Sequence, residues 1–588
     1  MRRTTRPHPW MASLGIGLLM SLASPVRAQW LDGGTRICGS ALEETPARCV
    51  AQPPGHLWVA WREFPAADTT HALLRVNRWN AAGQVEAGLP PCGFTLSSGQ
   101  RAVPEFGLSS DGADGVYAAW IERGPGGSRL LCQHVDGSGA TWPGWPGTAL
   151  LLADTSVAPG SLRSFGDDQG GLYVIWRVPG VNPGNPAYAT VRGIRILADG
   201  TVAPGWLAQG NVLRAQGAAL YEFDVAPDGL GGLLIVWVDN YFYYNQPQAY
   251  LSRYEADGGL PPGWHSAGAA VSSPSYYPQD HAKITPDGTG GAYIVWSGQE
   301  TYESPRRLFA MHRIATGGTA AGWPATGALV VPATFESPGL VPDGVGGAFL
   351  AGAVSANVVL QHMGAESPIA PGWPVTGFSL TFDAGAERPV GMVPDHEGGV
   401  LVAWQAAPCE ACPGVLRVQR RIPNGTIALD WPASGVLVAP LADSTAFPSA
   451  VEDGVGGMLL SWSEPSRDPG AENRDSRVQR ILLNALSGST VDAPHGPLGG
   501  IALRSAPNPA RGLVALEFEL PGPSTVRLTI EDVAGRVVWS RSGSAPGGGL
   551  ERWTWDGRTM RGAIAPPGFY LARIQSSWGE ARARLVRF

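Results

Sequence analysis

The sequence predicts an all-β protein made of repeated units of short strands, followed by a separate β module. The 588 residues include 80 Gly and 52 Pro but only 15% charged residues, where about 25% is usual. Hydrophobic residues make up 44% and Trp occurs 22 times, so the chain can bury a core. One short pattern recurs along most of the chain, and a different pattern begins near residue 501. A helical bundle, a coiled coil and a nucleic-acid-binding protein fit this composition poorly.

The N-terminus has the organisation of a secretory signal peptide. Arg2, Arg3 and Arg6 precede an apolar stretch over residues 11–22, and Val26 and Ala28 provide small residues at positions −3 and −1 of a cleavage site. The apolar stretch is short for a membrane span, although an uncleaved anchor is the alternative. We therefore expect removal of residues 1–28 and a mature chain without a membrane span, which is either secreted or held at the cell surface.

The repeated pattern is an acidic residue, a Gly-rich turn and an apolar run that ends in Trp. Repeats at a near-constant period are typical of solenoids and propellers. The copies end at spacings of 52 to 61 residues, the first is degenerate, and the sixth ends in Gly. They are Gln52–Trp61, Asp111–Trp120, Asp167–Trp176, Asp228–Trp237, Asp287–Trp296, Asp343–Gly352, Asp395–Trp404 and Asp453–Trp462.

Each unit also has a second half, which contains a short alternating run and then a Gly-Trp-Pro-like element before Gly-x-x-apolar. Residues 416–420 give one alternating run and residues 371–380 one Gly-Trp-Pro element. Together the two halves predict four antiparallel strands per unit. Such units are typical of β-propeller blades, so residues 29–497 are predicted to form an eight-bladed β-propeller. A β-solenoid is the alternative.

The two ends of the repeat region predict how the ring closes. The eighth unit has a third strand at residues 477–481 but lacks the following Trp and a clear fourth strand. The segment 30–42 begins with Trp and contains the missing pattern. We therefore expect the N-terminal strand to become the outer strand of the last blade, which removes an exposed sheet edge.

The units loosely resemble the bacterial delta-60 repeat and YVTN-type propellers, which share the Asp-Gly turn, an Arg-bearing strand and a Gly-rich ending. The resemblance covers roughly residues 30–495. It supports propeller architecture and implies no activity.

The chain carries an even number of cysteines, which suggests disulfides in an exported protein. We expect Cys38 and Cys49 to lie on either side of the ring closure, where a disulfide would join blade 8 to blade 1. The spacing of Cys409 and Cys412 fits a loop disulfide, with a metal or redox site as the alternative. All candidates for disulfide bonding are Cys38, Cys49, Cys92, Cys132, Cys409 and Cys412.

The C-terminal residues 498–588 alternate apolar and polar positions in about seven short strands, which predicts an Ig-like sandwich. Five motifs in this region closely resemble the flagellar hook-cap (FlgD-like) Ig-like domain and the related type A sorting domain of type IX secretion. The resemblance implies a module for secretion or for attachment at the cell surface, either cleaved or permanent. The motifs lie at residues 507–509, 520–521, 532–536, 555–558 and 568–570.

Catalytic motifs are scarce in this sequence. It has no GxSxG elbow, HExxH pair or phosphate-binding loop. The DGxGG turns offer one carboxylate each, whereas calcium needs about six oxygen ligands, so we interpret them as hairpin turns. No cofactor and no metal are expected.

A cation precedes each Gly-Trp position by eleven residues, and the eighth unit has an equivalent cation. One hypothesis is a ring of positive charges that binds an anion. The alternative, which we favour, is that each side chain pairs with a carbonyl or an acid of the next blade. The strand-2 Trp side chains are likewise expected to pack between blades. The cations are Arg78, His134, Arg195, Arg253, His312, His362, Arg420 and Arg480.

We predict that ligands bind on the face that carries the variable connections. These connections join strand 2 to strand 3 and strand 4 to strand 1 of the next unit. We call this face the loop face; binding residues favour variable loops on a rigid scaffold. Aromatic residues from adjacent blades gather there in sequence, either as a ligand patch or as a self-packed loop. The predicted ligand-binding residues are Tyr241, Phe242, Tyr243, Tyr244, Tyr276, Tyr277, His281, Tyr302 and Glu222.

These features predict a secreted or cell-surface, non-enzymatic and monomeric binding protein. Its expected partners are a surface protein or glycan and, through the C-terminal module, the secretion machinery. The alternative is a propeller glycoside hydrolase or polysaccharide lyase, which requires two facing carboxylates. A third interpretation is an envelope scaffold without a ligand. The candidate carboxylates are Glu105, Glu222, Glu336 and Glu387.

Overall fold

The chain divides into two compact units, Met1–Ser489 and Thr490–Phe588. A computed structural model describes residues 30–483 and 502–587 with short gaps, so the predicted signal peptide lies outside the described residues. The gaps are residues 31–32, 41, 53–54, 65–70, 156–158, 181–187, 216–217, 242–245, 273–277, 302, 382–385, 408–411, 430, 442–446, 469–472, 507–512, 520–522, 533–535, 547–549, 561, 567 and 577–578.

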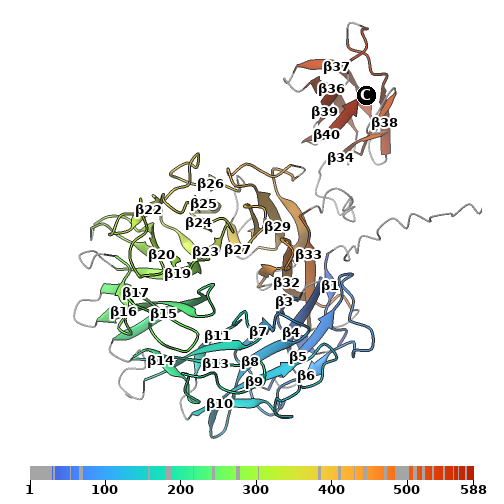
Figure 1. The fold of residues 1–588 in the computed structure, drawn as a ribbon. Helices are drawn as coiled ribbons and strands as arrows, with labels where there is room; N and C mark the ends of the chain where they lie inside the picture. Colours follow the sequence, from blue (N-terminus) through green and yellow to red (C-terminus); the bar gives the residue numbers. More distant parts are fainter. Residues whose placement is uncertain are drawn as a thin grey trace, which may run out of the picture. The chain divides into compact units, whose positions relative to one another are not determined.

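In the described part of unit 1, strand pairing gives eight antiparallel sheets that follow one another around a ring (Figure 1). We call them blades 1 to 8 and give the strands of each in chain order. Blade 1 contains β3 (Arg48–Gln52), β4 (His56–Phe64), β5 (Leu73–Trp79) and β6 (Phe94–Thr95), with β2 (Glu43–Glu44) paired to the end of β4. Blade 2 contains β7 (Phe106–Ser110), β8 (Val116–Gly124), β9 (Gly127–Val135) and β10 (Leu150–Thr155). Blade 3 contains β11 (Gly160–Gly166), β12 (Leu172–Val178), β13 (Thr190–Ile196) and β14 (Asn211–Arg214). Blade 4 contains β15 (Ala219–Pro227), β16 (Leu233–Tyr241), β17 (Gln246–Tyr254) and β18 (Ala269–Ala270).

The remaining blades repeat this order. Blade 5 contains β19 (Asp280–Pro286), β20 (Ala292–Gly298), β21 (Arg307–Arg313) and β22 (Ala328–Val331). Blade 6 contains β23 (Glu336–Pro342), β24 (Ala348–Val354), β25 (Asn357–Met363) and β26 (Phe378–Ser379). Blade 7 contains β27 (Ala386–Pro394), β28 (Val400–Ala407), β29 (Gly414–Arg421) and β30 (Val436–Leu441). Blade 8 contains β31 (Ser449–Glu452), β32 (Met458–Pro465) and β33 (Arg474–Ile481), and is completed by β1 (Thr35–Arg36).

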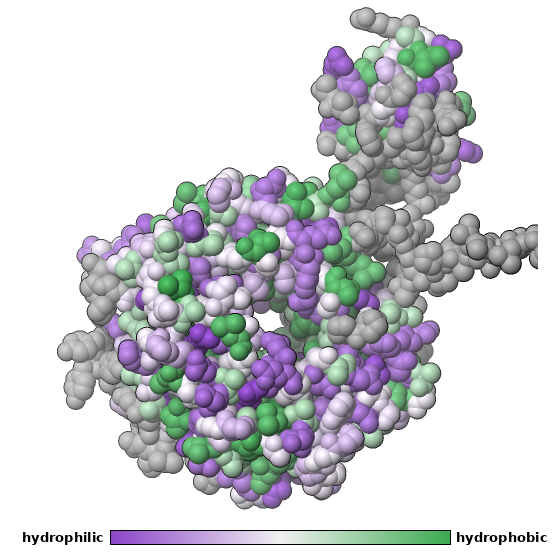
Figure 2. Space-filling view, viewed as in Figure 1, coloured by the Kyte–Doolittle hydropathy of each residue, from purple (hydrophilic) through white to green (hydrophobic). Residues whose placement is uncertain are grey.

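The first strand of each blade contacts the first strand of the next, and β31 contacts β3, which closes the circle. Figure 2 shows unit 1 hollowed at its centre, with both hydrophilic and hydrophobic residues around the opening. The second strands carry the apolar runs, whose side chains are buried between neighbouring blades. The predicted all-β propeller is confirmed, and its core consists of a series of inter-blade clusters.

The ring closes as the sequence predicts. Strand β1 pairs antiparallel with β33, with Thr35 opposite Val478. Trp30 donates its indole N–H to the Ala81 carbonyl at 3.1 Å and so supplies the Trp that the eighth unit lacks. Gly34 lies against Trp462, where a Cβ would come within 2.3 Å of the indole ring. The N-terminal segment thus fills the outer position of blade 8.

The expected disulfide between Cys38 and Cys49 is wrong. Cys38 is bonded to Cys92, which lies just before β6, so the closing segment is still joined covalently to blade 1. Cys49 lies on β3, where its side chain is buried in the apolar cluster of the closure, and its thiol is free. Cys132 is also free and buried, so these two cysteines are not disulfide partners. Cys412 is disulfide-bonded, whereas Cys409 lies outside the described residues.

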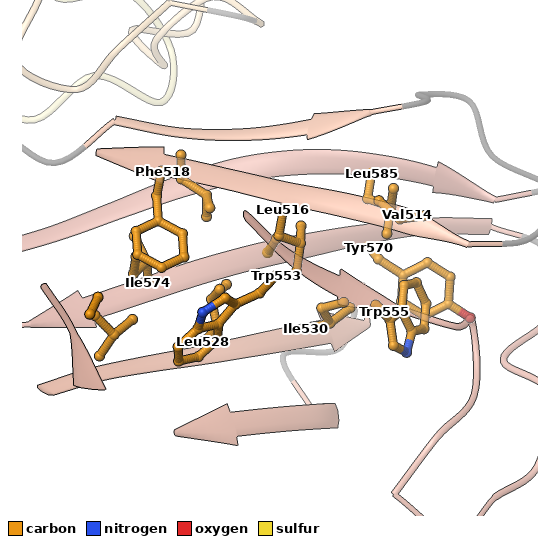
Figure 3. Close-up of a cluster of buried hydrophobic side chains, with 14 of the residues drawn as sticks. Val514, Leu516, Phe518, Leu528, Ile530, Trp553, Trp555, Tyr570, Ile574 and Leu585 are labelled. Atoms are coloured by element: carbon orange, nitrogen blue, oxygen red, sulfur yellow. The ribbon is translucent and has the colours of Figure 1, made fainter. Parts of the chain in front are cut away.

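Unit 2 is a sandwich of two antiparallel sheets, as predicted. One sheet contains β34 (Ala502–Ala506), β35 (Val514–Glu519) and β38 (Leu550–Trp555). The other contains β36 (Ser524–Asp532), β37 (Val537–Ala545), β39 (Gly568–Ser576) and β40 (Gly579–Arg587). Side chains from both sheets meet in one core, which includes Phe518, Trp553, Trp555 and Tyr570 (Figure 3).

Two of the motifs noted in the C-terminal sequence have clear packing roles. The Tyr570 hydroxyl donates to the Pro566 carbonyl at 2.7 Å, which resembles the tyrosine corner of Ig-like sandwiches. The Trp555 indole N–H donates to the Arg558 carbonyl at 2.7 Å and thereby fixes the turn that follows β38. Gly557 in this turn has a φ of +78°, and a Cβ there would overlap the Arg587 guanidinium. Glycine is favoured at that position by its positive φ.

Candidate functional site

The repeated acidic residue holds the hairpin turn between strands 1 and 2. In blade 4, Asp228 Oδ1 accepts hydrogen bonds from the amides of Leu230 and Gly232, both at 2.7 Å. The same oxygen position accepts amides two and four residues on in the other units that begin with Asp. One carboxylate oxygen of each turn is thus bound to the backbone of that turn, as expected of a hairpin rather than a calcium loop.

The second carboxylate oxygen binds the cation of strand 3 in the same blade. Arg253 Nε lies 2.8 Å from Asp228 Oδ2, and both side chains are buried. We expected an acid of the next blade as the partner, and the structure corrects this, because strand 3 lies beside strand 2 and returns to the turn of its own blade. The corresponding pairs are Asp111–His134, Asp167–Arg195, Asp287–His312, Asp343–His362, Asp395–Arg420 and Asp453–Arg480.

The next blade supplies a carbonyl, as expected. Arg253 Nη1 and Trp264 Nε1 both donate to the Ala315 carbonyl of blade 5, at 3.4 and 2.7 Å. Arg195 and Trp206 share the Ala256 carbonyl in the same way, and His312 and Trp323 share that of Ala365. We call this arrangement of cation, Trp and shared carbonyl the inter-blade latch. It gives Arg195, Arg253 and His312 a structural role between blades, whereas the Nδ1 atoms of His134 and His362 have no hydrogen-bond partner among the described residues.

The hydrogen bonds to the turn carboxylates shift their pKa values. Burial by itself would raise the pKa of Asp111, but hydrogen bonds from His134 and from the Ala113 and Gly115 amides outweigh it and lower that pKa. The pKa values of Asp287 and Asp343 are lowered in the same manner. These carboxylates therefore stay ionised, and they remain hydrogen-bonded within their own hairpins.

Blade 1 departs from the pattern because Gln52 replaces the acid. Its amide Nε2 donates to the Ala113 carbonyl at 2.7 Å, and its Oε1 accepts the Trp58 indole N–H at 3.2 Å. Arg78 pairs instead with Asp114 of blade 2. The degenerate first copy thus keeps a link to the next blade through different atoms.

The strand-2 Trp side chains are buried between blades, as predicted, with exposed fractions of 0 to 2%. In blades 3, 4, 5, 7 and 8 the Trp leans on a glycine just before strand 4: a Cβ at Gly210 would lie 2.5 Å from Trp176, and one at Gly268 would lie 2.3 Å from Trp237. In blade 6, where the sequence has Gly352, the Phe335 ring fills the space. In these five blades the glycine of the Gly-x-x-apolar pattern is a packing requirement of the Trp.

Most of the predicted aromatic patch lies outside the described residues. Phe242, Tyr243, Tyr244, Tyr276, Tyr277 and Tyr302 lie outside the described residues, and Tyr241 is placed only as the last residue of β16. The other two predicted residues meet at the junction of blades 4 and 5. Glu222 Oε1 accepts the Ala282 amide at 3.1 Å, next to His281, which is exposed and has a φ of 55°.

Two of the four candidate catalytic carboxylates accept backbone amides of the next blade. Glu105 accepts the amides of Ser161 and Leu162 at 3.1 and 2.7 Å, at the irregularity in β11. Glu222 occupies the equivalent place at β19. Glu387 is buried, and Glu336 is exposed. In these positions Glu105 and Glu222 connect the first strands of neighbouring blades.

A cavity of about 490 Å³ lies on the loop face, between the outer parts of blades 4 and 5. Its lining contains the apolar residues Trp296, Phe309 and Leu329, which we call the floor, and polar residues, which we call the rim. The rim residues are Ser272, Gln279, Gln299, Glu300 and Thr326. None of these residues was predicted to bind a ligand. The sequence contains one signal: two places after the strand-2 Trp, this unit has Gly298, whereas several other units have an acid there.

A second cavity, of about 720 Å³, lies among the first strands of blades 1 to 4 and 8, and Ser109, Ser164, Asp168 and Glu452 contribute to its lining. Burial and the neighbouring Asp167 and Asp228 raise the pKa of Asp168.

Within the described residues, the ligand atoms of one group of potential metal ligands, Cys38, Glu44 and Glu63, lie within 4.8 Å of one another. The Cys38 sulfur, however, is bonded in a disulfide.

Comparison with known proteins identifies the C-terminal region. Residues 509–580 match the FlgD Ig-like domain, in agreement with the predicted resemblance of this module. Comparison with curated proteins gives no match. No described segment forms a helix with the length and apolar character needed to cross a membrane.

Solved structures provide distant likenesses to the repeat region. Sqt1 from Chaetomium thermophilum is 13% identical, with a TM-score of 0.39, and the match covers 76% of this chain and 98% of Sqt1. A eukaryotic initiation factor is 8% identical, with a TM-score of 0.35 and coverages of 88% and 98%. A prolyl endopeptidase is 13% identical with a TM-score of 0.37, and the chain spans 53% of its length. Such likenesses carry no argument about function, and the propeller rests on the strand pairing above.

Proposed function

We propose that the chain is an exported, non-enzymatic binding protein whose loop face holds a surface glycan. In this proposal its C-terminal unit serves secretion or attachment at the cell surface. The observation that carries it is the cavity beside Trp296, which combines an aromatic floor with a polar rim on the face that bears the variable loops.

The chemistry of the opposite face supports this choice. The repeated acids and cations there hold turns and join blades, so they are committed to internal hydrogen bonds. Glu105 and Glu222, two of the four carboxylates considered for a glycoside hydrolase, accept backbone amides. This arrangement favours binding over hydrolysis.

The C-terminal match supports the second part. Residues 509–580 match the FlgD Ig-like domain, and the motifs of this module also resemble the type A sorting domain of type IX secretion. The N-terminal sequence has the features of a signal peptide. Export followed by surface attachment accounts for both ends of the chain.

One experiment tests binding and catalysis together. The chain without residues 1–28 is applied to an array of oligosaccharides, and the same sugars are incubated with it and analysed by mass spectrometry. We expect binding to a subset of glycans without new reducing ends. Absence of glycan binding, binding to proteins alone, or release of shortened sugars would each overturn the proposal.

Export is tested separately in a Gram-negative host. The full chain should be recovered outside the inner membrane with Gln29 as its first residue, and deletion of residues 498–588 should abolish its retention at the cell surface. Recovery of the full chain in the cytoplasm with Met1 intact would contradict export.

A further inference from the structure

The residue two places after the strand-2 Trp has a defined role in several blades. In blade 1, Glu63 accepts the Trp61 indole N–H at 3.2 Å. In blade 4, Asp239 accepts the Trp237 indole N–H at 3.0 Å and also pairs with Arg214. Glu122 of blade 2 accepts the Trp120 indole N–H in the same way. The chain therefore places its own carboxylate at the indole edge and satisfies a buried donor.

Blade 5 lacks this carboxylate. The equivalent residue is Gly298, and a Cβ built there would lie 3.4 Å from the Trp296 Cδ1 and Nε1 atoms and from the Phe309 ring. The cavity of about 490 Å³ opens at this point. No hydrogen-bond acceptor for the Trp296 indole N–H is found among the described residues, so this donor is available to an occupant of the cavity.

The Trp296 ring is held in place before any ligand binds. Gly327 lies against the far end of the indole, where a Cβ would come within 2.4 Å of Cη2. Phe309 stacks beside the indole with ring centroids 6.1 Å apart. A fixed donor lowers the entropy cost of binding, because little freedom remains to be lost.

The rim provides further hydrogen-bond donors and acceptors. Gln299 donates from Nε2 to the Ser304 carbonyl at 2.6 Å, which orients its amide oxygen as an acceptor. Thr326 is exposed and offers a hydroxyl group. Glu300 contributes a carboxylate that is paired with Arg307 at 3.2 Å. The occupant must therefore accept from an indole, donate to an amide or carboxylate oxygen, and cover an apolar floor.

These requirements select one class of ligand. An anionic group would meet Glu300, while Arg307 is already paired with that carboxylate. A purely apolar group would leave the indole N–H and the Gln299 oxygen without partners. A pyranose has hydroxyls that both donate and accept, together with an apolar C–H face that packs on aromatic rings. The cavity is within the size range of about 300–1,000 Å³ of small-ligand sites.

We propose that the cavity beside Trp296 binds one pyranose unit of a neutral glycan. This inference rests on the proposed function and specifies where and how that function is carried out.

The test introduces into blade 5 the carboxylate that blade 4 already has. Gly298→Asp places an acceptor at the Trp296 indole edge and fills the mouth of the cavity. The matched control is Ala406→Asp, which puts the same side chain two residues after Trp404 in blade 7. The mature wild type and both variants are first screened on an array of neutral oligosaccharides and then titrated calorimetrically with the trisaccharide that the wild type binds best.

We expect Gly298→Asp to weaken binding roughly tenfold or more, which corresponds to about 1.4 kcal/mol, while Ala406→Asp leaves it unchanged. Circular dichroism and the thermal midpoint verify that both variants fold. Wild-type binding that survives Gly298→Asp would place the ligand elsewhere and overturn the inference, with the proposed function intact. Preference for acidic sugars would also overturn it. Failure of the wild type to bind any glycan would overturn the inference and the proposed function together.

Discussion

Glu44 is a buried acid at the ring closure and should make the stability of unit 1 depend on pH. It lies on β2 and is 1% exposed. Its Oε2 accepts the Ser476 amide of β33 at 2.8 Å, which links blade 1 to blade 8. Its Oε1 is buried without a partner. Burial, with further contributions from Asp475 and Glu63, raises the pKa of Glu44 to about 8.

The sign of the effect follows from proton linkage. Between its usual pKa of 4.5 and about 8, Glu44 keeps a proton in the folded chain and loses it in the unfolded chain. The free energy of unfolding therefore falls as pH rises through this window, by about 1.36 kcal/mol for each pH unit. The accumulated loss above pH 8 amounts to roughly 4–5 kcal/mol. A glutamine in place of Glu44 would keep the hydrogen bond with Ser476 without a group that ionises.

The assay measures the guanidinium midpoint of the wild type and of Glu44→Gln by Trp fluorescence at pH 5, 7 and 9. We expect equal midpoints at pH 5 and a variant that becomes progressively more stable than the wild type towards pH 9. Glu366→Gln, at an exposed position, should follow the wild type throughout. A difference between Glu44→Gln and the wild type that is the same at every pH, or a variant that is less stable at pH 9, would refute the reasoning.

Two substitutions test the packing of the blades. Asp228→Ala removes the partner of the buried Arg253 and should lower the free energy of unfolding by about 3–5 kcal/mol. In a double-mutant cycle with Arg253→Gln, the two losses of stability should not add. Additive losses would argue against the pair. Gly210→Ala places a Cβ 2.5 Å from Trp176 at a φ of +79° and should cost about 2–4 kcal/mol, measured from the thermal midpoint. Gly372→Ala has a similar φ but open space around it, so it should cost only about 1–2 kcal/mol; equal costs at the two glycines would contradict the role of the Trp.

Much of the fold could be predicted because each unit repeats the same physical requirements. The acid, the Gly-rich turn and the Trp recur since every blade needs a capped hairpin and a large side chain against its neighbour. Trp30 predicted the closure for the same reason, as it supplies the Trp that the last unit lacks. The glycine against Trp462 is Gly34, next to β1, which the sequence pattern did not single out. The partner of Cys38 could not be predicted, because it depends on how the segment after β1 passes beside blade 1.

The cavity was harder to predict than the fold. A comparison of the units shows Gly298 where Glu63 and Asp239 stand, but the meaning of the difference needs the structure. Only the hydrogen bonds from the indole groups reveal that this position satisfies a buried donor in blades 1, 2 and 4. The partners of the cations were predicted wrongly in part for a similar reason, since sequence spacing does not show whether Arg253 reaches an acid of its own blade or of the next.

Closure of the ring by β1 is the central structural claim, and one cross-link tests it directly. Arg36 and Arg477 are register partners in the β1–β33 pair, so their Cα atoms lie about 4.5–5.5 Å apart, within reach of a disulfide. In a chain that carries Cys38→Ser and Cys92→Ser, Arg36→Cys should form a disulfide with Arg477→Cys on oxidation, as mapped by mass spectrometry of non-reduced peptides. Arg36→Cys combined with Arg417→Cys, at the matching position of blade 7, should remain unlinked. Free thiols in the first pair, or linkage in the second, would contradict closure by the N-terminal strand.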